Sequence, residues 1–289
     1  MNYQGDVIRP PSEADSIIIQ ATVGCSHNSC TFCGAYKNKV FRIRDVAEVE
    51  ENIDLCNRYQ PEAKTVFLAD GDALILSQKR LTSLLTLIRE RLPRIRRISV
   101  YANAKAIRNK SVRDLADLRS LGLGRIYMGL ESGDGEVLAS VKKGETPESM
   151  LAAATRVREA GIFFSVTVLL GLAGDSGSTD HAIKTGLLLS EMAPNQIAAL
   201  TLMPIPSTPL SDDIQRGIFT LPDANSMLRE LRTMLEYIHC DRTQFMANHA
   251  SNYLPLQGRL QRDRDKLIHT IDQALDGKRT LSPEFTRGL

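Results

Sequence analysis

The stretch Gly24-Cys25-Ser26-His27-Asn28-Ser29-Cys30-Thr31-Phe32-Cys33-Gly34 carries three of the five cysteines of the chain. It follows the apolar run Ser16 to Val23, whose β-branched residues predict a strand. A loop that leaves a strand can bring three thiolates to one metal centre. Such clustering makes three incidental loop thiols a poor explanation. The stretch therefore predicts a metal site.

The spacing of the cysteines, Cys-x4-Cys-x2-Cys, bears on which metal it is. Zinc sites usually combine two Cys/His pairs, and no second pair lies nearby, although His27 could serve as a fourth zinc ligand between two of the cysteines. Three cysteines that hold a four-iron cluster leave one iron without a protein ligand, where a small molecule can coordinate. The spacing favours an iron–sulfur cluster and leaves zinc as the alternative.

Composition excludes several classes of protein. The chain has 289 residues, 43% hydrophobic and 24% charged, which is typical of a globular protein with one large domain or slightly more. A net charge of +2 gives no basic field for nucleic acid, so we expect no nucleic-acid partner. We find no signal-peptide pattern in the first residues and no membrane-spanning apolar run. We expect a cytoplasmic protein without a membrane partner, in which thiols stay reduced and serve as ligands.

Short apolar segments alternate with amphipathic ones along the first two thirds of the chain. This alternation predicts an α/β fold with a parallel sheet, and six units favour a partial (β/α)6 TIM-like barrel over a closed one of eight. The predicted strands are 16–22, 65–68, 98–102, 125–130, 162–170 and 196–202.

Two regions follow from this pattern. Residues 1–210 form the predicted barrel core, after a polar lead-in at 1–15. Residues 211–289 form a C-terminal extension that packs on the barrel, and helical periodicity at 221–238 and 262–275 predicts that it is helical. The Leu/Met stripe of 221–238 is typical of core packing.

Polar residues and glycines gather just past the carboxyl ends of the predicted strands. Ligands bind at that rim in such folds, because loops from many strands converge there. Each residue alone is weak evidence, since loops are polar anyway, but they share the rim with the cysteine loop. The set is Cys25, Cys30, Cys33, Asp70, Asp72, Asn103, Glu131, Ser132 and Gly174.

Three motifs together resemble the radical S-adenosylmethionine (SAM) superfamily. They are the cysteine loop, Met128-Gly129-Leu130-Glu131-Ser132-Gly133, and Val141-Lys142-Lys143-Gly144. The resemblance spans residues 14–210 and is nearest to oxygen-independent coproporphyrinogen oxidase and its uncharacterised relatives. It implies an oxygen-sensitive enzyme in which SAM chelates the open iron of a [4Fe–4S] cluster and is reductively cleaved to a 5′-deoxyadenosyl radical. The common loop is Cys-x3-Cys-x2-Cys, so this chain has one extra residue.

The resemblance also implies roles for individual residues. Cys25, Cys30 and Cys33 would ligate the cluster. Phe32 would pack near the adenine, the Asp70-Gly71-Asp72 backbone would bind the SAM amino group, and Glu131 would accept hydrogen bonds from the ribose. Gly171 to Gly174 would pass close to the adenine or carboxylate. Apart from the resemblance, their position on the rim predicts that Asn103 and Ser132 join the cofactor site. The alternatives are ordinary turn glycines and a solvated loop carboxylate at Glu131.

The remaining cysteines, Cys56 and Cys240, are too few for a second cluster. We therefore expect one cluster, a small-molecule substrate, and an electron donor such as a flavodoxin or ferredoxin. One alternative is a non-catalytic iron–sulfur or zinc protein that senses iron or redox state. Another is an enzyme that cleaves SAM to a different fragment, such as an aminocarboxypropyl radical.

One segment of the extension, residues 245–256, combines amides and hydroxyls with apolar flanks. Buried polar groups must be hydrogen-bonded, so the segment could be a satisfied strut against the barrel. It could instead be a polar lid over the substrate, with Asn248, His249 and Asn252 as substrate-site candidates. Neutral polar groups orient a substrate without adding charge. The sequence leaves both interpretations open.

Overall fold

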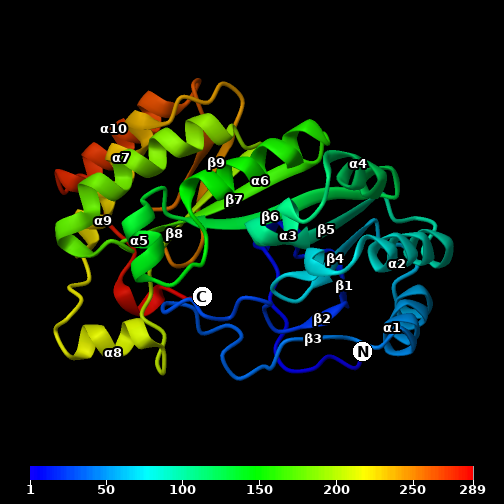
Figure 1. Ribbon diagram of the computed structural model, residues 1–289. Helices are drawn as coiled ribbons and strands as arrows, with labels where there is room; N and C mark the ends of the chain where they lie inside the picture. Colours follow the sequence, from blue (N-terminus) through cyan, green and yellow to red (C-terminus); the bar gives the residue numbers. More distant parts are fainter. Residues whose placement is uncertain (289) are drawn as a thin grey trace. The chain divides into compact units, whose positions relative to one another are not determined.

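The computed structural model describes residues 1–288, which form two compact units (Figure 1). Unit 1 comprises Met1–Asn28, Ala35–Met128 and Ala152–Phe164. Unit 2 comprises Ser29–Gly34, Gly129–Leu151 and the described residues from Ser165 onward. The chain therefore passes between units within the cysteine loop as well as within secondary-structure elements.

Unit 1 holds the first four strands of the parallel sheet, in the order β1-β4-β5-β6. They are β1 (Ile17–Gln20), β4 (Thr65–Ala69), β5 (Arg97–Tyr101) and β6 (Leu123–Glu131), whose last residues enter unit 2. The connecting helices are α1 (Val46–Tyr59), α2 (Gln78–Arg91), α3 (Ala104–Arg108) and α4 (Val112–Ser120). Smaller elements are the antiparallel pair β2 (Thr22–Val23) and β3 (Arg42–Ile43) and the 3-10 turns η1 (Pro11–Glu13) and η2 (Ala73–Ile75).

Unit 2 continues with strands in the order β7-β8-β9-β10. They are β7 (Phe163–Leu170), which begins in unit 1, β8 (Gln196–Thr201), β9 (Gln244–Ala247) and β10 (Leu256–Arg259). The helices are α5 (Gly135–Ser140), α6 (Pro147–Glu159), which runs on into unit 1, α7 (Gly174–Met192), α8 (Pro209–Gln215), α9 (Ala224–Tyr237) and α10 (Arg264–Leu275), with η3 (Glu284–Thr286) last. Among residues 1–288, no helix combines the length and apolar character needed to cross a membrane.

The mostly parallel α/β architecture confirms the predicted fold class, but the C-terminal extension is more than helices. β9 pairs parallel with β8, and β10 pairs antiparallel with β9. The expectation of a helical extension was incomplete because β9 is only four residues long, with Phe245 and Ala247 buried and polar residues around them. So short a run has no periodicity to distinguish it from the amide-rich segment that follows.

Helices α7 and α9 pack closely inside unit 2. The apolar stripe of α9 is buried, as its periodicity predicted, through Met227, Leu228, Leu231, Met234 and Leu235. Each such side chain contributes about 1.5–3 kcal/mol to the free energy of folding. Gly186 of α7 permits the close approach, because a Cβ there would lie 2.8 Å from the Met234 carbonyl oxygen.

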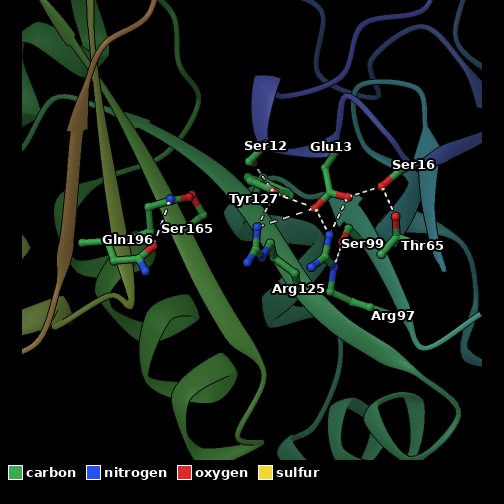
Figure 2. A network of polar contacts seen from close by, with 11 residues as sticks. Ser12, Glu13, Ser16, Thr65, Arg97, Ser99, Arg125, Tyr127, Ser165 and Gln196 are labelled. Carbon is green, nitrogen blue, oxygen red and sulfur yellow. Dashed lines mark hydrogen bonds and ion pairs between the residues drawn. The ribbon is translucent and has the colours of Figure 1, made fainter. Parts of the chain in front are cut away.

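A carboxylate from the lead-in occupies the amino ends of the unit 1 strands (Figure 2). Glu13 of η1 is 1% exposed. Its Oε1 accepts a hydrogen bond from the Tyr127 hydroxyl (2.7 Å) and its Oε2 one from Ser16 (2.5 Å). Arg97 Nη2 lies 3.0 Å from Oε2, and Arg125 Nη1 lies 3.7 Å from Oε1. The polar lead-in is thus tied through Glu13 to β5, to β6 and to Ser16, directly before β1.

Although burial alone would raise it, the pKa of Glu13 is held below its usual value by the hydrogen bonds from Ser16 and Tyr127 and the charge of Arg97. A lowered carboxyl pKa adds stability above the unfolded-state pKa, and this stability is lost as the pH falls through the folded-state pKa.

We predict that Glu13→Gln lowers the free energy of unfolding by about 1–3 kcal/mol at pH 7, because it removes a charged acceptor from buried donors. The deficit shrinks as the pH falls below the unfolded-state value of about 4.5 and through the lowered folded-state pKa, where the wild type becomes protonated too. Urea titrations at pH 7 and at a series of acidic pH values measure both effects. The exposed Glu51→Gln is the matched control, and an equal loss in both variants at pH 7 would contradict this role for Glu13.

Candidate functional site

The three predicted ligand cysteines divide between the two units. Cys25 lies in unit 1, two residues after the end of β2, and Cys30 and Cys33 lie on the Ser29–Gly34 segment of unit 2. All three are partly exposed, and none of the five cysteines is in a disulfide. Cys56 and Cys240 are buried; burial raises the pKa of Cys56 to about 11 and also raises the pKa of Cys240. Both buried thiols are therefore poor sources of thiolate.

Asp70, directly after β4, holds the backbone that precedes Cys25. Its side chain is fully buried, and its Oδ2 accepts hydrogen bonds from the Gly24 amide (3.0 Å) and from Gln20 Nε2 (3.0 Å). The ammonium of Lys39 lies 3.5 Å from the same oxygen. A buried carboxylate needs such donors to offset its desolvation. Asp70 thus serves to fix the loop.

Asp72 fixes Ser26, the residue that follows Cys25. Its Oδ2 accepts hydrogen bonds from the Ser26 hydroxyl (2.5 Å) and from Asn103 Nδ2 (2.7 Å), and its Oδ1 accepts one from the Asn103 amide (3.2 Å). Asn103 Oδ1 caps α3 by accepting from the Ala106 amide (2.7 Å). The sequence predicted Asp72 and Asn103 as cofactor contacts; the structure shows both side chains engaged in holding Ser26 and α3.

Gly71 lies between these two carboxylates and against the cysteine itself. Its amide donates to the Gly24 carbonyl oxygen (3.2 Å). A Cβ at this position would lie 2.6 Å from the Tyr36 ring and 3.0 Å from the Cys25 Cβ. Glycine is therefore required here by space, which the interpretation as an ordinary turn glycine does not explain.

The second half of the cysteine loop is anchored inside unit 2. The Thr31 amide donates to the Val141 carbonyl oxygen (3.0 Å), and the Thr31 carbonyl oxygen accepts from the Leu210 amide (3.1 Å). Phe32 packs on the apolar cluster of Val141, Leu172, Leu202 and Leu210. The backbone and the aromatic ring together fix the two cysteines that flank them. Val141 lies within a motif recognised in the sequence but was given no role there, and Leu210 was missed because its apolar side chain gives no functional signal.

Glu131 ends β6 with a left-handed backbone conformation, φ +66°. Its Oε1 lies 2.9 Å from the Lys143 ammonium, and both side chains are largely buried, at 13% and 14% exposure. A Cβ on Gly129 would come within 2.1 Å of this oxygen, so Gly129 leaves the space that the carboxylate occupies. A positive φ in a non-glycine residue costs about 1–3 kcal/mol and is typical of functional sites.

Ser132 and Gly133, which follow Glu131, are buried within unit 2. Ser132 is fully buried; its Oγ accepts from the Asp134 amide (2.9 Å) and lies 2.8 Å from His181 Nδ1. Gly133 donates its amide to Thr185 Oγ1 (2.8 Å), and a Cβ there would overlap the α7 backbone. Ser132, predicted as a cofactor contact, has its hydroxyl occupied within the protein.

Gly171 and Gly174, at the end of β7, both have positive φ, +83° and +69°. The Gly171 amide donates to Glu230 Oε1 (2.8 Å), and a Cβ on Gly171 would lie 2.8 Å from Met227 Cε. Glu230 is buried on α9. Sequence reasoning missed it, because a glutamate inside an amphipathic helix is usually assigned to the solvated face.

The three substrate-site candidates of the extension separate into two kinds. Asn252 is buried, and its amide oxygen and nitrogen bond Thr201 Oγ1 (2.8 Å) and the Ala199 carbonyl oxygen (2.9 Å) on β8. It is a strut. Asn248 contacts Gln257 (3.3 Å) at the surface, and half-buried His249 contacts Ser251 Oγ (3.0 Å). Burial lowers the pKa of His249.

The donor set fits an iron–sulfur cluster in its chemistry. The three loop cysteines are partly exposed, outside any disulfide, and anchored on both sides, whereas Cys56 and Cys240 are buried. Neither unit by itself, within residues 1–288, gathers three His, Cys, Asp or Glu side chains into a metal site. The assignment of the ligand set therefore depends on the spacing and on the anchored loop.

Comparison with known proteins gives the family. Residues 19–185 match the model of the radical SAM superfamily. The heme chaperone HemW of Bacillus subtilis is 25% identical over 165 residues, which are 56% of this chain and 43% of that protein. HemW of Mycobacterium tuberculosis is 26% identical over 171 residues, 56% of this chain and 41% of that protein. The chain thus spans less than half the length of these relatives.

Solved structures show the same fold. Coproporphyrinogen III oxidase (HemN) from Escherichia coli aligns with a TM-score of 0.57 and 18% identity, covering 77% of this chain and 51% of that chain. The radical SAM methyltransferase TsrM from Kitasatospora setae, with cobalamin and a [4Fe–4S] cluster bound, aligns with a TM-score of 0.61 and 16% identity, covering 90% and 61%. The matched segment 19–185 contains the whole cysteine loop, Glu131 and Gly171, and on that ground this chain belongs to the radical SAM superfamily.

Proposed function

We propose that this chain is a radical SAM enzyme in which Cys25, Cys30 and Cys33 hold one [4Fe–4S] cluster. The superfamily uses such a cluster together with SAM. The observation that carries the proposal is the anchored loop: three partly exposed thiols, flanked by Asp70 and Asp72 contacts in one unit and by Thr31 contacts in the other. When bound, the cluster and SAM supply a 5′-deoxyadenosyl radical that abstracts hydrogen from the substrate.

The residues around the loop then have distinct roles. Glu131 accepts hydrogen bonds from the ribose hydroxyls of SAM, and Lys143, 2.9 Å from its carboxylate, offsets the charge and holds its rotamer. The backbone of residues 70–72 binds the amino group of SAM, next to Cys25. Phe32 fixes the segment between Cys30 and Cys33 through its packing on the apolar cluster, and its ring lies near the adenine in this proposal.

A second group of residues shapes the site and makes no contact with the cofactor in this proposal. Asp70, Asp72 and Asn103 fix the loop around Cys25, while Ser132, Gly171 and Gly174 set the ends of β6 and β7. Their side chains or backbone amides are already engaged within the protein.

The substrate in this proposal is a small molecule that contacts Asn248 and His249. These two residues keep hydrogen-bonding capacity toward solvent, unlike Asn252. An electron donor such as a flavodoxin or ferredoxin supplies the reducing electron.

A specific observation supports a second candidate function. The curated relatives are named heme chaperones, so the same fold and cysteine loop could serve a non-catalytic role, as the sequence alternative of an iron–sulfur protein also held. Cleavage of SAM to an aminocarboxypropyl fragment is a further alternative within catalysis.

The product of anaerobic reduction with SAM separates these functions. The proposal predicts 5′-deoxyadenosine and methionine by mass spectrometry, formed slowly without substrate. 5′-Methylthioadenosine would indicate the aminocarboxypropyl route. Intact SAM together with a stoichiometric heme absorbance band after heme addition would overturn the catalytic proposal and favour the chaperone function.

Removing one ligand cysteine tests the cluster assignment. We expect Cys30→Ala to lose most of its iron and sulfide after anaerobic reconstitution and to cleave no SAM, because three thiolates are the minimum for the site. Cys240→Ala is the control, since its thiol is buried in unit 2 and away from solvent. Full iron content and SAM cleavage in Cys30→Ala would contradict the assignment, as would loss of iron in the control.

Glu131→Gln tests the ribose contact. It should weaken SAM binding by about 1–3 kcal/mol, roughly 5- to 150-fold in Kd, because a charged acceptor is replaced and Lys143 loses its partner. Isothermal titration of the reconstituted, oxidised protein with SAM measures this. Glu136→Gln, an exposed change five residues later, should bind as wild type. Equal affinity in the wild type and Glu131→Gln would remove Glu131 from the site.

A further inference from the structure

A row of buried polar side chains joins three elements of unit 2. Ser132 follows β6, His181 lies on α7 and Glu230 lies on α9, and all three side chains are buried, at 0–2% exposure. Ser132 Oγ lies 2.8 Å from His181 Nδ1. His181 Nε2 makes no hydrogen bond of normal geometry and lies 3.4 Å from Glu230 Oε1. The row ends where the Glu230 carboxylate meets Gly171 and Ser178.

The donors of this row have one consistent direction when Glu230 is ionised. Ser132 Oγ accepts from the Asp134 amide, so its own hydrogen is available to His181 Nδ1. The imidazole hydrogen is then on Nε2, which faces the carboxylate. The Gly171 amide and the Ser178 hydroxyl also donate to that carboxylate, at 2.8 and 2.5 Å.

A proton added to Glu230 reverses the direction. The protonated carboxyl donates to His181 Nε2, which can accept only if the imidazole hydrogen moves to Nδ1. Nδ1–H then donates to Ser132 Oγ, and the Ser132 hydroxyl hydrogen rotates out of the line between these two atoms. The network gains one proton in total, the imidazole stays neutral, and the carboxyl becomes a weaker acceptor for the Gly171 amide.

We propose that Ser132, His181 and Glu230 form a proton-linked relay through which the C-terminal extension positions the ends of β6 and β7. Ser132 is adjacent to Glu131, and Glu230 holds Gly171 directly, so one proton on α9 acts on both loops. Its relevance to SAM depends on the proposed function; the relay itself does not. Glu230 is a positioning residue in this account.

The environment places the proton exchange near neutrality. Burial raises the pKa of Glu230 to about 7 against the lowering effect of Ser178 and Gly171, and burial lowers the pKa of His181 to about 4. The charged group that acts on His181 is Asp134, the N-cap residue of α5, whose carboxylate is itself 2.8 Å from Lys184 of α7. His181 therefore stays neutral while Glu230 gains or loses its proton.

The tautomer of His181 tests the relay without any cofactor ligand. In the full chain labelled with ¹⁵N-histidine, we expect the Nε2–H tautomer at pH 8 and the Nδ1–H tautomer at pH 6. Glu230→Gln, which is neutral at both pH values, should show no change of tautomer. A wild-type imidazole that keeps one tautomer from pH 5.5 to 8.5, or becomes imidazolium there, would overturn the proposal.

Thermal stability gives a second test with opposite signs for the two partners. Between about pH 4.5 and 6.5 the folded pair carries its proton on Glu230 and the unfolded pair carries it on His181, so proton counts match and the pair adds little pH dependence.

Replacing either His181 or Glu230 reveals the pH dependence of stability that comes from the remaining group. Relative to wild type, His181→Gln leaves a carboxyl that holds its proton more tightly when folded, so Tm should fall by several degrees as the pH rises from 4.5 to 7. Glu230→Gln leaves an imidazole that loses its proton on folding, so Tm should rise by several degrees from pH 4 to 6.5. Shifts of the same sign in both variants would contradict the pairing.

SAM affinity connects the relay to the proposed site. For each protein we take the ratio of the SAM affinity at pH 8 to that at pH 6. We expect this ratio to be about fivefold larger in the wild type than in Glu230→Gln. Dividing one ratio by the other cancels the titration of SAM itself. Glu131→Gln should bind more weakly at both pH values and show a smaller pH ratio than the wild type, because only the Gly171 loop still responds to the proton. A normalised ratio of one, with the tautomer change present, would confine the relay to structure and overturn its positioning role.

Discussion

The hydrogen bond from the Ser26 hydroxyl to the buried carboxylate of Asp72 fixes the loop that carries Cys25. A carboxylate without solvent must receive donors, and an unmet need of this kind costs several kcal/mol. Asp72 receives the Ser26 hydroxyl and two donors of Asn103, and Asp70 receives the Gly24 amide. The loop cannot move without leaving these acceptors unpaired. The need to pair the two buried carboxylates therefore fixes the position of Cys25.

The same principle recurs in unit 2 with different groups. Thr31 uses both of its backbone groups to fix the segment of Cys30 and Cys33, and Glu230 gathers the Gly171 amide at the end of β7. Glycines at 71, 129 and 133 leave space for the Tyr36 ring, the Glu131 carboxylate and the α7 backbone, respectively, since a Cβ at each would meet these atoms at 2.6 Å or less. The functional rim is thus built from buried acceptors and from absent side chains.

Much of this could be predicted from sequence, and the failures have physical reasons. Cysteine spacing and strand–helix alternation are local patterns, so the cluster motif and the six parallel strands were accessible. The position of Asp72 at a strand end was also correct, but a position does not say whether a side chain faces a ligand or the protein. Glu13 and Glu230 were missed because, apart from Ser16, the partners of Glu13 are 84 to 114 residues away, and the partners of Glu230 are 49 to 59 residues away.

The central claim is that the anchored cysteines hold a cluster with one iron open to SAM. Electron–nuclear double resonance on the reduced protein, with SAM labelled by ¹⁵N at the amino group and ¹⁷O at the carboxylate, tests it most directly. The account predicts hyperfine coupling of both nuclei to the cluster in the wild type. A reduced [4Fe–4S] cluster whose spectrum shows neither coupling under saturating SAM would contradict it.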